Sequence, residues 1–143
     1  MPSSSTWPRP LLCVALLVTS SACQAADPPP VVTVAQLSAD PQAYDGRVVT
    51  LTGFLGLEED SYNVWATDVA MYDLDRNACV SLKRWPRDPK VRQRLDAEWG
   101  SVTGIFTADA RVKGGRRIIR FGACSDMAID IAEVADIRLV EHR

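Results

Sequence analysis

A turn followed by a long alternating segment dominates the pattern of hydrophobic and polar positions. Asp45-Gly46 is a turn dipeptide, because glycine adopts positive φ angles without steric cost. Immediately after it, residues 48–53 alternate at a period of two, which is the period of a β-strand. The pattern predicts a strand over Arg47–Leu57 that bends at one of its glycines, where the missing side chain permits a corner.

Shorter runs of the same kind predict four further strands. A hairpin turn, Lys113-Gly114-Gly115-Arg116, joins the last two. Two later segments are less regular: residues 128–132 fit either a strand or a short helix, and residues 134–140 alternate only imperfectly. The acidic segment 67–78 is predicted to be irregular. The four strands are expected at Tyr62–Ala66, Cys79–Leu82, Ser101–Ala108 and Arg117–Phe121.

One helix is expected between the third and fourth strands. Asp88 is a predicted N-cap, and Pro89 follows at the first helical position, where a missing N–H costs nothing. Apolar residues then recur every four positions, at Val91, Leu95 and Trp99, until a glycine ends the helix. Such an apolar stripe predicts a helix that plugs a barrel.

The N-terminus has the layout of a signal peptide. Arg9 precedes the apolar run Leu11–Val18, and small residues follow it. The run is shorter than the roughly 20 apolar residues that span a bilayer. Ser20-Ser21-Ala22-Cys23 then resembles the lipobox of bacterial lipoproteins, with Ser20 where a branched apolar residue is usual. The resemblance implies lipidation of Cys23; the alternative is ordinary cleavage near Ala22, Ala25 or Ala26.

A spacer and a short helical turn are predicted next. Asp27-Pro28-Pro29-Pro30 favours an extended polyproline conformation. Thr33 is a predicted N-cap for a turn through Leu37, which ends before Pro41 because the residue before proline is disfavoured in a helix. We therefore expect a signal peptide in 1–22, a lipidation site and spacer in 23–32, and one domain in 33–143.

Composition and charge limit the classes of partner. The 143 residues are 47% hydrophobic and 24% charged, which suits one globular domain. Arg9 is the only charged residue of 1–22, so its removal leaves 15 basic against 18 acidic residues. The chain has no overall positive field to attract nucleic acid or anionic membrane, and neither is an expected partner. Membrane contact is expected through the lipid alone.

The cysteines fit an exported protein. Cys79 and Cys124 remain as an even pair once Cys13 and Cys23 are set aside, and an oxidising compartment favours a disulfide between them. The alternative is two buried free thiols. A metal site is not expected, because the only histidine is His142.

The order of three strands, a helix and two strands is that of the OB-fold, a small five-stranded Greek-key barrel. Four further sequence features lie within Thr33–Thr107: Val34-Ala35-Gln36-Leu37, Asp40-Pro41-Gln42-Ala43-Tyr44-Asp45-Gly46-Arg47-Val48-Val49, Gly53 and Val102-Thr103-Gly104-Ile105-Phe106. In these features the chain resembles a family of uncharacterised exported OB-fold-like bacterial proteins. The resemblance implies a mainly β fold and no particular activity.

Basic and aromatic residues supply a candidate ligand-binding surface. OB-folds bind through the loop between strands four and five, the loop after strand one and the face of strands two and three. A charged hairpin tip is the ordinary case, and Glu58, Glu59 and Asp60 weaken the positive field beside it. The candidates are Arg111, Lys113, Arg116, Arg117 and Arg120 around the hairpin, with Trp65, Lys83, Arg84 and Trp85 as a stacking and charged complement.

Metal binding and catalysis have less support. Asp73, Asp75 and Asn77 match the start of an EF-hand loop, but Ala78 replaces the glycine of its sharp turn and Arg84 its bidentate glutamate. We expect these residues to form a solvated acidic loop and not a cation site. No histidine is placed to activate a nucleophile, and no cofactor is expected.

The sequence therefore predicts a non-enzymatic, exported protein, periplasmic or anchored by lipid in a bacterial envelope. It would act as a binding or scaffold module for an envelope component that the sequence does not identify. Two alternatives stay open. One is a barrel that binds an oligosaccharide, an oligonucleotide or another anion through the hairpin between strands four and five, and the other is an envelope hydrolase that uses carboxylates.

Overall fold

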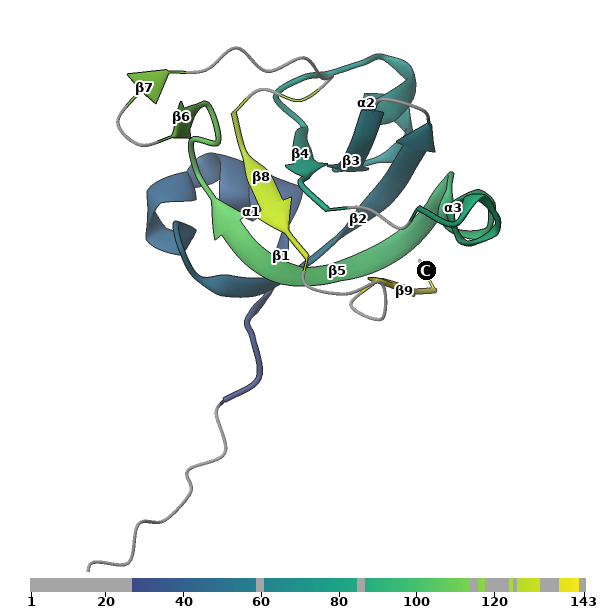
Figure 1. The fold of residues 1–143 in the computed structure, drawn as a ribbon, viewed down its shortest axis with the longest axis horizontal. Helices are drawn as coiled ribbons and strands as arrows, with labels where there is room; N and C mark the ends of the chain where they lie inside the picture. The colour runs from purple at the N-terminus through teal and green to yellow at the C-terminus, as the bar shows by residue number, and fades with distance from the viewer. Residues whose placement is uncertain are drawn as a thin grey trace, which may run out of the picture.

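The computed structural model describes residues 27–58, 61–84, 87–113, 116–117, 124, 126–131 and 137–141. Residues 27–30 lead as an extended segment into β1 (Val31–Thr33), below the barrel in Figure 1. Helix α1 (Val34–Ala39) follows, and its Thr33 cap and end before Pro41 confirm the predicted helical turn. The sequence pattern missed β1, which pairs in parallel with the long strand that comes next. A 3-10 helix, η1 (Pro41–Tyr44), completes this lead-in.

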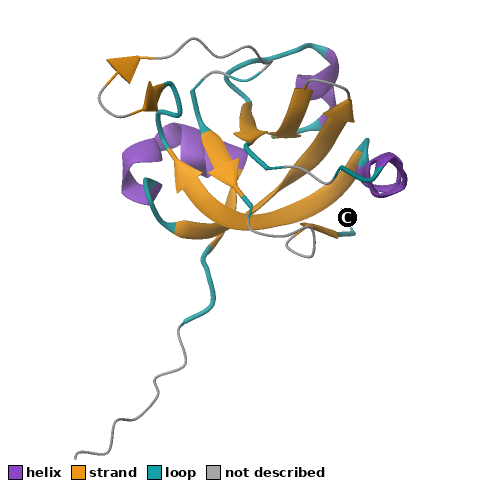
Figure 2. Cartoon of the chain, viewed as in Figure 1, coloured by secondary structure: helices purple, strands orange, loops and turns teal. Residues whose placement is uncertain are grey.

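Five strands close into a barrel, as predicted (Figures 1 and 2). Around the barrel the order is β2, β3, β4, β8 and β5, and β5 pairs again with β2. Every pairing is antiparallel except that of β4 with β8. The architecture is a small, mainly β, OB-like barrel. Its strands are β2 (Val48–Glu58), β3 (Ser61–Trp65), β4 (Cys79–Leu82), β5 (Glu98–Thr107) and β8 (Ala128–Asp130).

The fifth barrel strand differs from the prediction. It is β8, whereas the predicted strand at Arg117–Phe121 begins in β7 (Arg116–Arg117) and then leaves the described residues. Strand β7 pairs antiparallel with β6 (Val112–Lys113), as the predicted hairpin requires, while the two glycines of its turn lie outside the described residues. The physical reason is burial: Ala128 and Ile129 are apolar and fully buried between β4 and β5, a position that charged residues do not favour.

The barrel interior is built from alternate positions of the strands. The first alternating segment is confirmed as β2, whose positions 49, 51, 55 and 57 are buried in the core. Gly53 and Gly100 face each other in the pairing of β2 with β5. A Cβ at Gly100 would lie 2.6 Å from Leu55 Cδ1, so only glycine allows these strands to pack this closely over the core. The core also contains Leu37, Val64, Val80, Val102, Phe106 and Ile129.

Helix α3 (Pro89–Leu95) lies between β4 and β5, as predicted, but it is shorter than predicted. Leu95 is buried and Val91 packs partly against the core, so these two residues plug the barrel. Trp99 instead belongs to β5. Its ring packs edge-on against Phe54, with centroids 6.0 Å apart. Both belong to a second apolar cluster, whose buried members are Phe54, Trp65, Cys79 and Cys124.

The early end of α3 has a local cause. Asp96 takes an extended conformation, and its Oδ1 accepts a hydrogen bond from the Leu57 N–H at 2.6 Å. The Ala97 N–H then donates to the Leu55 carbonyl at 2.9 Å, which begins the pairing of β5 with β2. Hydrogen bonds to β2 therefore replace the last predicted helical turn.

A five-residue helix, α2 (Asp68–Tyr72), replaces part of the segment predicted to be irregular. Thr67 caps it by accepting a hydrogen bond from the Ala70 N–H at 3.0 Å. A single helical turn is too short for a repeating apolar pattern, so this helix could not be predicted from periodicity. In the described part of the chain, no helix has the length and apolar character needed to cross a bilayer.

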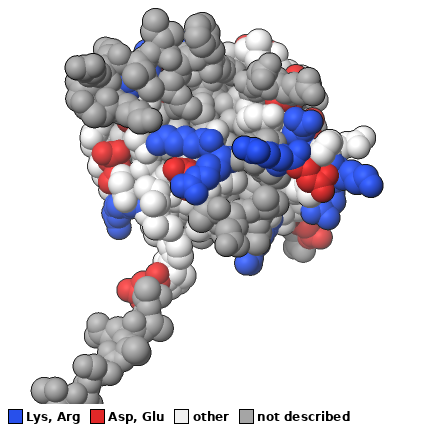
Figure 3. Space-filling model, viewed as in Figure 1, with Lys and Arg blue, Asp and Glu red and all other residues white. Residues whose placement is uncertain are grey.

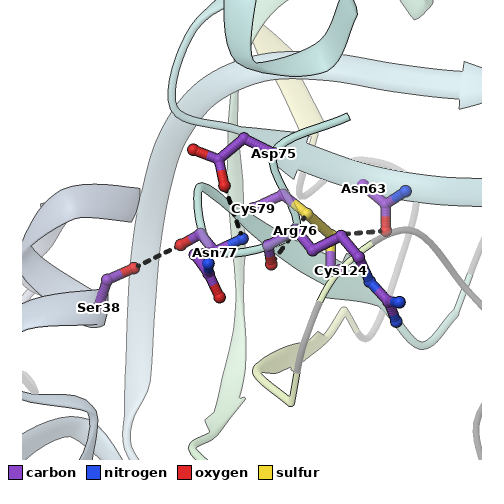
Figure 4. Close-up of a disulfide and its surroundings, with 7 residues drawn as sticks. All are labelled: Ser38, Asn63, Asp75, Arg76, Asn77, Cys79 and Cys124. Carbon is purple, nitrogen blue, oxygen red and sulfur yellow. Dashed lines mark hydrogen bonds between the residues drawn. A yellow bond between two sulfur atoms is a disulfide. The ribbon is translucent and has the colours of Figure 1, made fainter. Parts of the chain in front are cut away.

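The disulfide predicted between Cys79 and Cys124 is present in the structure, with Cα atoms 5.3 Å apart (Figure 4). Both cysteines are buried in the second apolar cluster, together with Phe54 and Trp65. The Asn63 side chain lies beside the bond, 3.0 Å from the Cys124 sulfur. The disulfide therefore ties residue 124 to the outer face of β3 and β4.

Candidate functional site

The structure separates the residues that the sequence grouped into one ligand-binding surface. Trp65 is only 2% exposed and lies in the second apolar cluster, with α2 and the disulfide against it. The structure therefore does not bring its ring together with Lys83 and Arg84, and a role of Trp65 in ligand binding stays a prediction. The cause is local: Gly56 has no side chain, and the Trp65 indole occupies the space above it.

The basic hairpin contributes less than the sequence suggested. Arg111 forms an ion pair with Asp126, so its charge is already matched. Lys113, Arg116 and Arg117 lie on the β6–β7 hairpin, where the structure describes the backbone and not these side chains. Arg120, Trp85 and Cys23 lie outside the described residues. The described part of the hairpin region thus offers no assembled site.

Lys83 and Arg84 instead meet Tyr62 and Arg87 around a hollow of about 470 Å³, here called the basic hollow. Lys83 and Arg84 directly follow β4, Tyr62 comes from the start of β3, and Arg87 precedes the N-cap of α3. Three segments that are separate in the sequence therefore supply one surface. Figure 3 shows Lys and Arg side chains gathered across this face, over β8 and toward α3, with acidic side chains interspersed.

Hydrogen bonds hold several of these side chains in place. Lys83 Nζ donates to Thr107 Oγ1 at 3.1 Å, which fixes the ammonium beside β5. Arg84 Nε lies 2.7 Å from Asp130 Oδ1, an ion pair to β8. Both side chains are exposed, so these contacts orient them and add little to stability. A guanidinium held by one edge keeps its other N–H groups available to a ligand.

Arg92 and Arg87 make this surface more basic. Arg92 of α3 donates to the Tyr62 hydroxyl at 3.2 Å, which places a fourth cation beside the basic hollow. Arg87 is exposed and forms no ion pair with another residue of the described segments. Between Lys83 and Arg94 the sequence holds six basic residues and one acidic residue. The local excess of positive charge contrasts with the net charge of −2 of the whole chain.

Sequence reasoning found Lys83 and Arg84 and missed Tyr62, Arg87 and Arg92. The signal available was the run of basic residues from 83 to 94, of which only Lys83 and Arg84 were included among the candidates. Tyr62 carried no signal, because its approach to Arg92 depends on how α3 packs at the end of the barrel. The pairing therefore required the three-dimensional fold.

The chemistry of the basic hollow is that of anion recognition. Guanidinium groups donate paired hydrogen bonds to carboxylate, sulfate or phosphate, and an ammonium adds a point charge. Across the described segments, no three His, Cys, Asp or Glu side chains are grouped to hold a metal ion. Comparison of the chain with family models, curated proteins and solved structures finds no match.

Proposed function

We propose that the barrel is a non-enzymatic binding module that holds an anionic ligand in the basic hollow. One observation carries the proposal: Lys83, Arg84 and Arg87 converge with Tyr62 around a hollow of about 470 Å³ on the exposed surface of a closed barrel. Ligand sites are concavities of roughly this size, with a few polar groups that fix orientation. An anionic oligosaccharide or an oligonucleotide would present the charges that this surface complements.

The proposal places the ligand beside β4 and α3 and away from the β6–β7 hairpin. Arg111 pairs with Asp126 and Arg84 pairs with Asp130, whereas Arg87 has no carboxylate partner within the described segments. An uncompensated cation gains more from a ligand than one whose charge is neutralised. The phenol of Tyr62 adds a flat apolar surface beside the charges, which suits a sugar ring or a base.

We also propose that the protein is exported and anchored in a bacterial envelope by a lipid on Cys23. The support is the arrangement of the leader in the sequence and the position of the spacer. The extended segment Asp27–Pro30 leaves the barrel below β1 in Figure 1. At about 3 Å per residue, the extended segment Asp27–Pro30 alone adds roughly 12 Å between the barrel and the lipid. A barrel held in this way would present its ligand to another envelope component.

The test is a screen for ligands that raise the melting temperature of the purified protein. A compound that binds the folded state alone raises the melting temperature by mass action. The screen compares sulfated and carboxylated oligosaccharides, single-stranded oligonucleotides and peptidoglycan fragments with neutral sugars and divalent cations. We expect stabilisation by at least one anionic class and none by neutral sugars. A screen without any effect would favour a purely structural role.

A further inference from the structure

A second surface, separate from the basic hollow, exposes apolar side chains that the barrel does not need. Val69, Tyr72 and Leu74, on α2 and the turn after it, are 60%, 73% and 64% exposed. Tyr72 and Leu74 border a hollow of about 260 Å³, whose other lining residues are Gly56, Glu58, Trp65 and Met71. We call Val69, Tyr72 and Leu74, with the hollow beside them, the α2 apolar patch. Val69 and Tyr72 lie one helical turn apart on α2, and exposed apolar side chains grouped beside a hollow form a candidate interaction site.

Leu74 occupies a backbone position that normally belongs to glycine. Its φ is 53°, in the left-handed region. The N–H of Leu74 donates to the Met71 carbonyl at 3.1 Å, and that of Asp75 donates to the Ala70 carbonyl at 2.9 Å. This pair of bonds is the Schellman motif that ends many helices, usually with glycine where Leu74 stands. A leucine there costs about 1 kcal/mol of backbone strain.

The strain at Leu74 is not compensated within the barrel. The side chain is mostly exposed, so it gains little from burial in this structure. Strained, exposed apolar residues are typical of sites that act on a partner. We interpret Leu74 as a contact residue whose apolar side chain is buried only when a partner is bound.

The side of the hollow at Gly56 is closely packed. A Cβ at Gly56 would lie 2.6 Å from Trp65 Nε1 and 3.0 Å from Met71 Sδ, so the two side chains already fill the space above the glycine. Trp65 lies in the same cluster as Phe54 and the disulfide, which limits its movement. A preformed apolar hollow binds an apolar side chain without the cost of rearrangement.

Charge indicates the chemistry of the partner. Glu58 lines the hollow, Asp68 begins α2, and Asp73 and Asp75 flank Leu74 along the chain. Among the described residues from Glu58 to Asn77, four are acidic and one, Arg76, is basic. An apolar surface among carboxylates repels anionic lipid headgroups and favours a cationic partner. The complementary partner is a protein segment with an apolar side chain between lysines or arginines.

We propose that the α2 apolar patch docks such a basic, apolar segment of a partner protein, with an apolar side chain in the hollow between Trp65 and Leu74. The site does not depend on anion binding in the basic hollow. Two features of the surface recognise the segment: the hollow accepts the apolar anchor, and the surrounding carboxylates select flanking basic residues. Both contributions are separable in an experiment.

The test measures the binding of three short synthetic peptides to the purified protein by fluorescence anisotropy. The first peptide carries a Trp-Leu pair between lysines, the second carries Gly-Ser between the same lysines, and the third carries Trp-Leu between glutamates. We expect the first peptide to bind and the other two to bind about tenfold more weakly or worse, because each lacks one of the two recognised features.

The decisive variant is Leu74→Gly. Glycine suits the positive φ, so the melting temperature should stay the same or rise, whereas binding of the first peptide should fall about tenfold. The matched control is Leu139→Ser, which removes an exposed leucine of β9 (Ile137–Leu139) outside the patch and should leave binding unchanged.

Several outcomes would overturn the docking proposal. They are failure of the first peptide to bind, equal binding of all three peptides, and unchanged binding by Leu74→Gly. Self-association, or binding to anionic phospholipid vesicles, that is lost in Leu74→Gly would assign the patch to a different occupant and would equally overturn the proposal.

Discussion

The indole of Trp65 lies directly over Gly56 on the outer face of the barrel. A Cβ at position 56 would approach Trp65 Nε1 to 2.6 Å, closer than real side chains come. Because position 56 has no side chain, the indole packs against β2 beside Met71 of α2, and Trp65 does not line the basic hollow. One residue without a side chain thereby separates the two candidate surfaces of the protein.

Gly56→Ala should destabilise the barrel by about 1–3 kcal/mol, because the added methyl group forces Trp65 and Met71 out of position. Chemical denaturation of the variant and the wild type measures the difference. Glu58→Ala is the control, since it lies two residues further along the same strand and is exposed. Equal stability of the two variants would show that the Trp65 ring moves at no cost.

Loss of the disulfide should lower the free energy of unfolding by roughly 4 kcal/mol in the chain-entropy model for a loop of this length. The comparison is between wild type and Cys79→Ser/Cys124→Ser, each unfolded by denaturant under oxidising conditions. Adding a reductant should bring the wild type to the level of the variant. Labelling of Cys79 and Cys124 by a thiol reagent in the unreduced, unfolded protein would contradict the bond.

Ala97→Gly should stabilise the protein by up to about 1 kcal/mol. Ala97 has a φ of 57°, which strains any residue with a side chain. Ala39→Gly, at the exposed end of α1, is the control and should destabilise by about 0.5–1 kcal/mol, because glycine disfavours a helix. Thermal unfolding distinguishes the two, and the same direction of change in both would refute the assignment of strain to Ala97.

Labelled palmitate should enter the wild-type protein and be absent from Cys23→Ser, if Cys23 is the lipidation site. The lipid on Cys23 is the proposed membrane anchor of the protein. The variant should therefore shift from the membrane fraction to the soluble fraction of cells. Wild-type protein that takes up no label would leave ordinary signal cleavage as the explanation of the leader.

Much of the fold could be predicted because local patterns and the fold agree along most strands. The alternation after Gly46 correctly predicted β2, and the cap at Thr33 correctly predicted α1. The prediction failed where tertiary contacts decided the local structure. Trp99 continued the helical spacing of Val91 and Leu95, yet hydrogen bonds to β2 drew it into a strand.

The candidate site was less predictable than the fold. Lys83 and Arg84 were found from their charge, but Arg87 and Tyr62 join them only because β3, β4 and the start of α3 meet at one end of the barrel. Trp65 was assigned to the ligand surface because aromatic rings on β-strands often stack with ligands. Its burial depends on Gly56, nine positions earlier, and on a helix too short to leave a pattern.

The most direct test of anion binding in the basic hollow is calorimetric titration of the purified protein with a sulfated oligosaccharide and a single-stranded oligonucleotide. The wild type is compared with Lys83→Ala/Arg87→Glu and with Arg138→Glu, an exposed arginine of β9 that lines no part of the hollow. We predict saturable, salt-sensitive binding of at least one anion to the wild type and to Arg138→Glu, and about tenfold weaker binding to the double variant. Equal affinity of all three proteins, or no binding of either anion to the wild type, would contradict the proposed function.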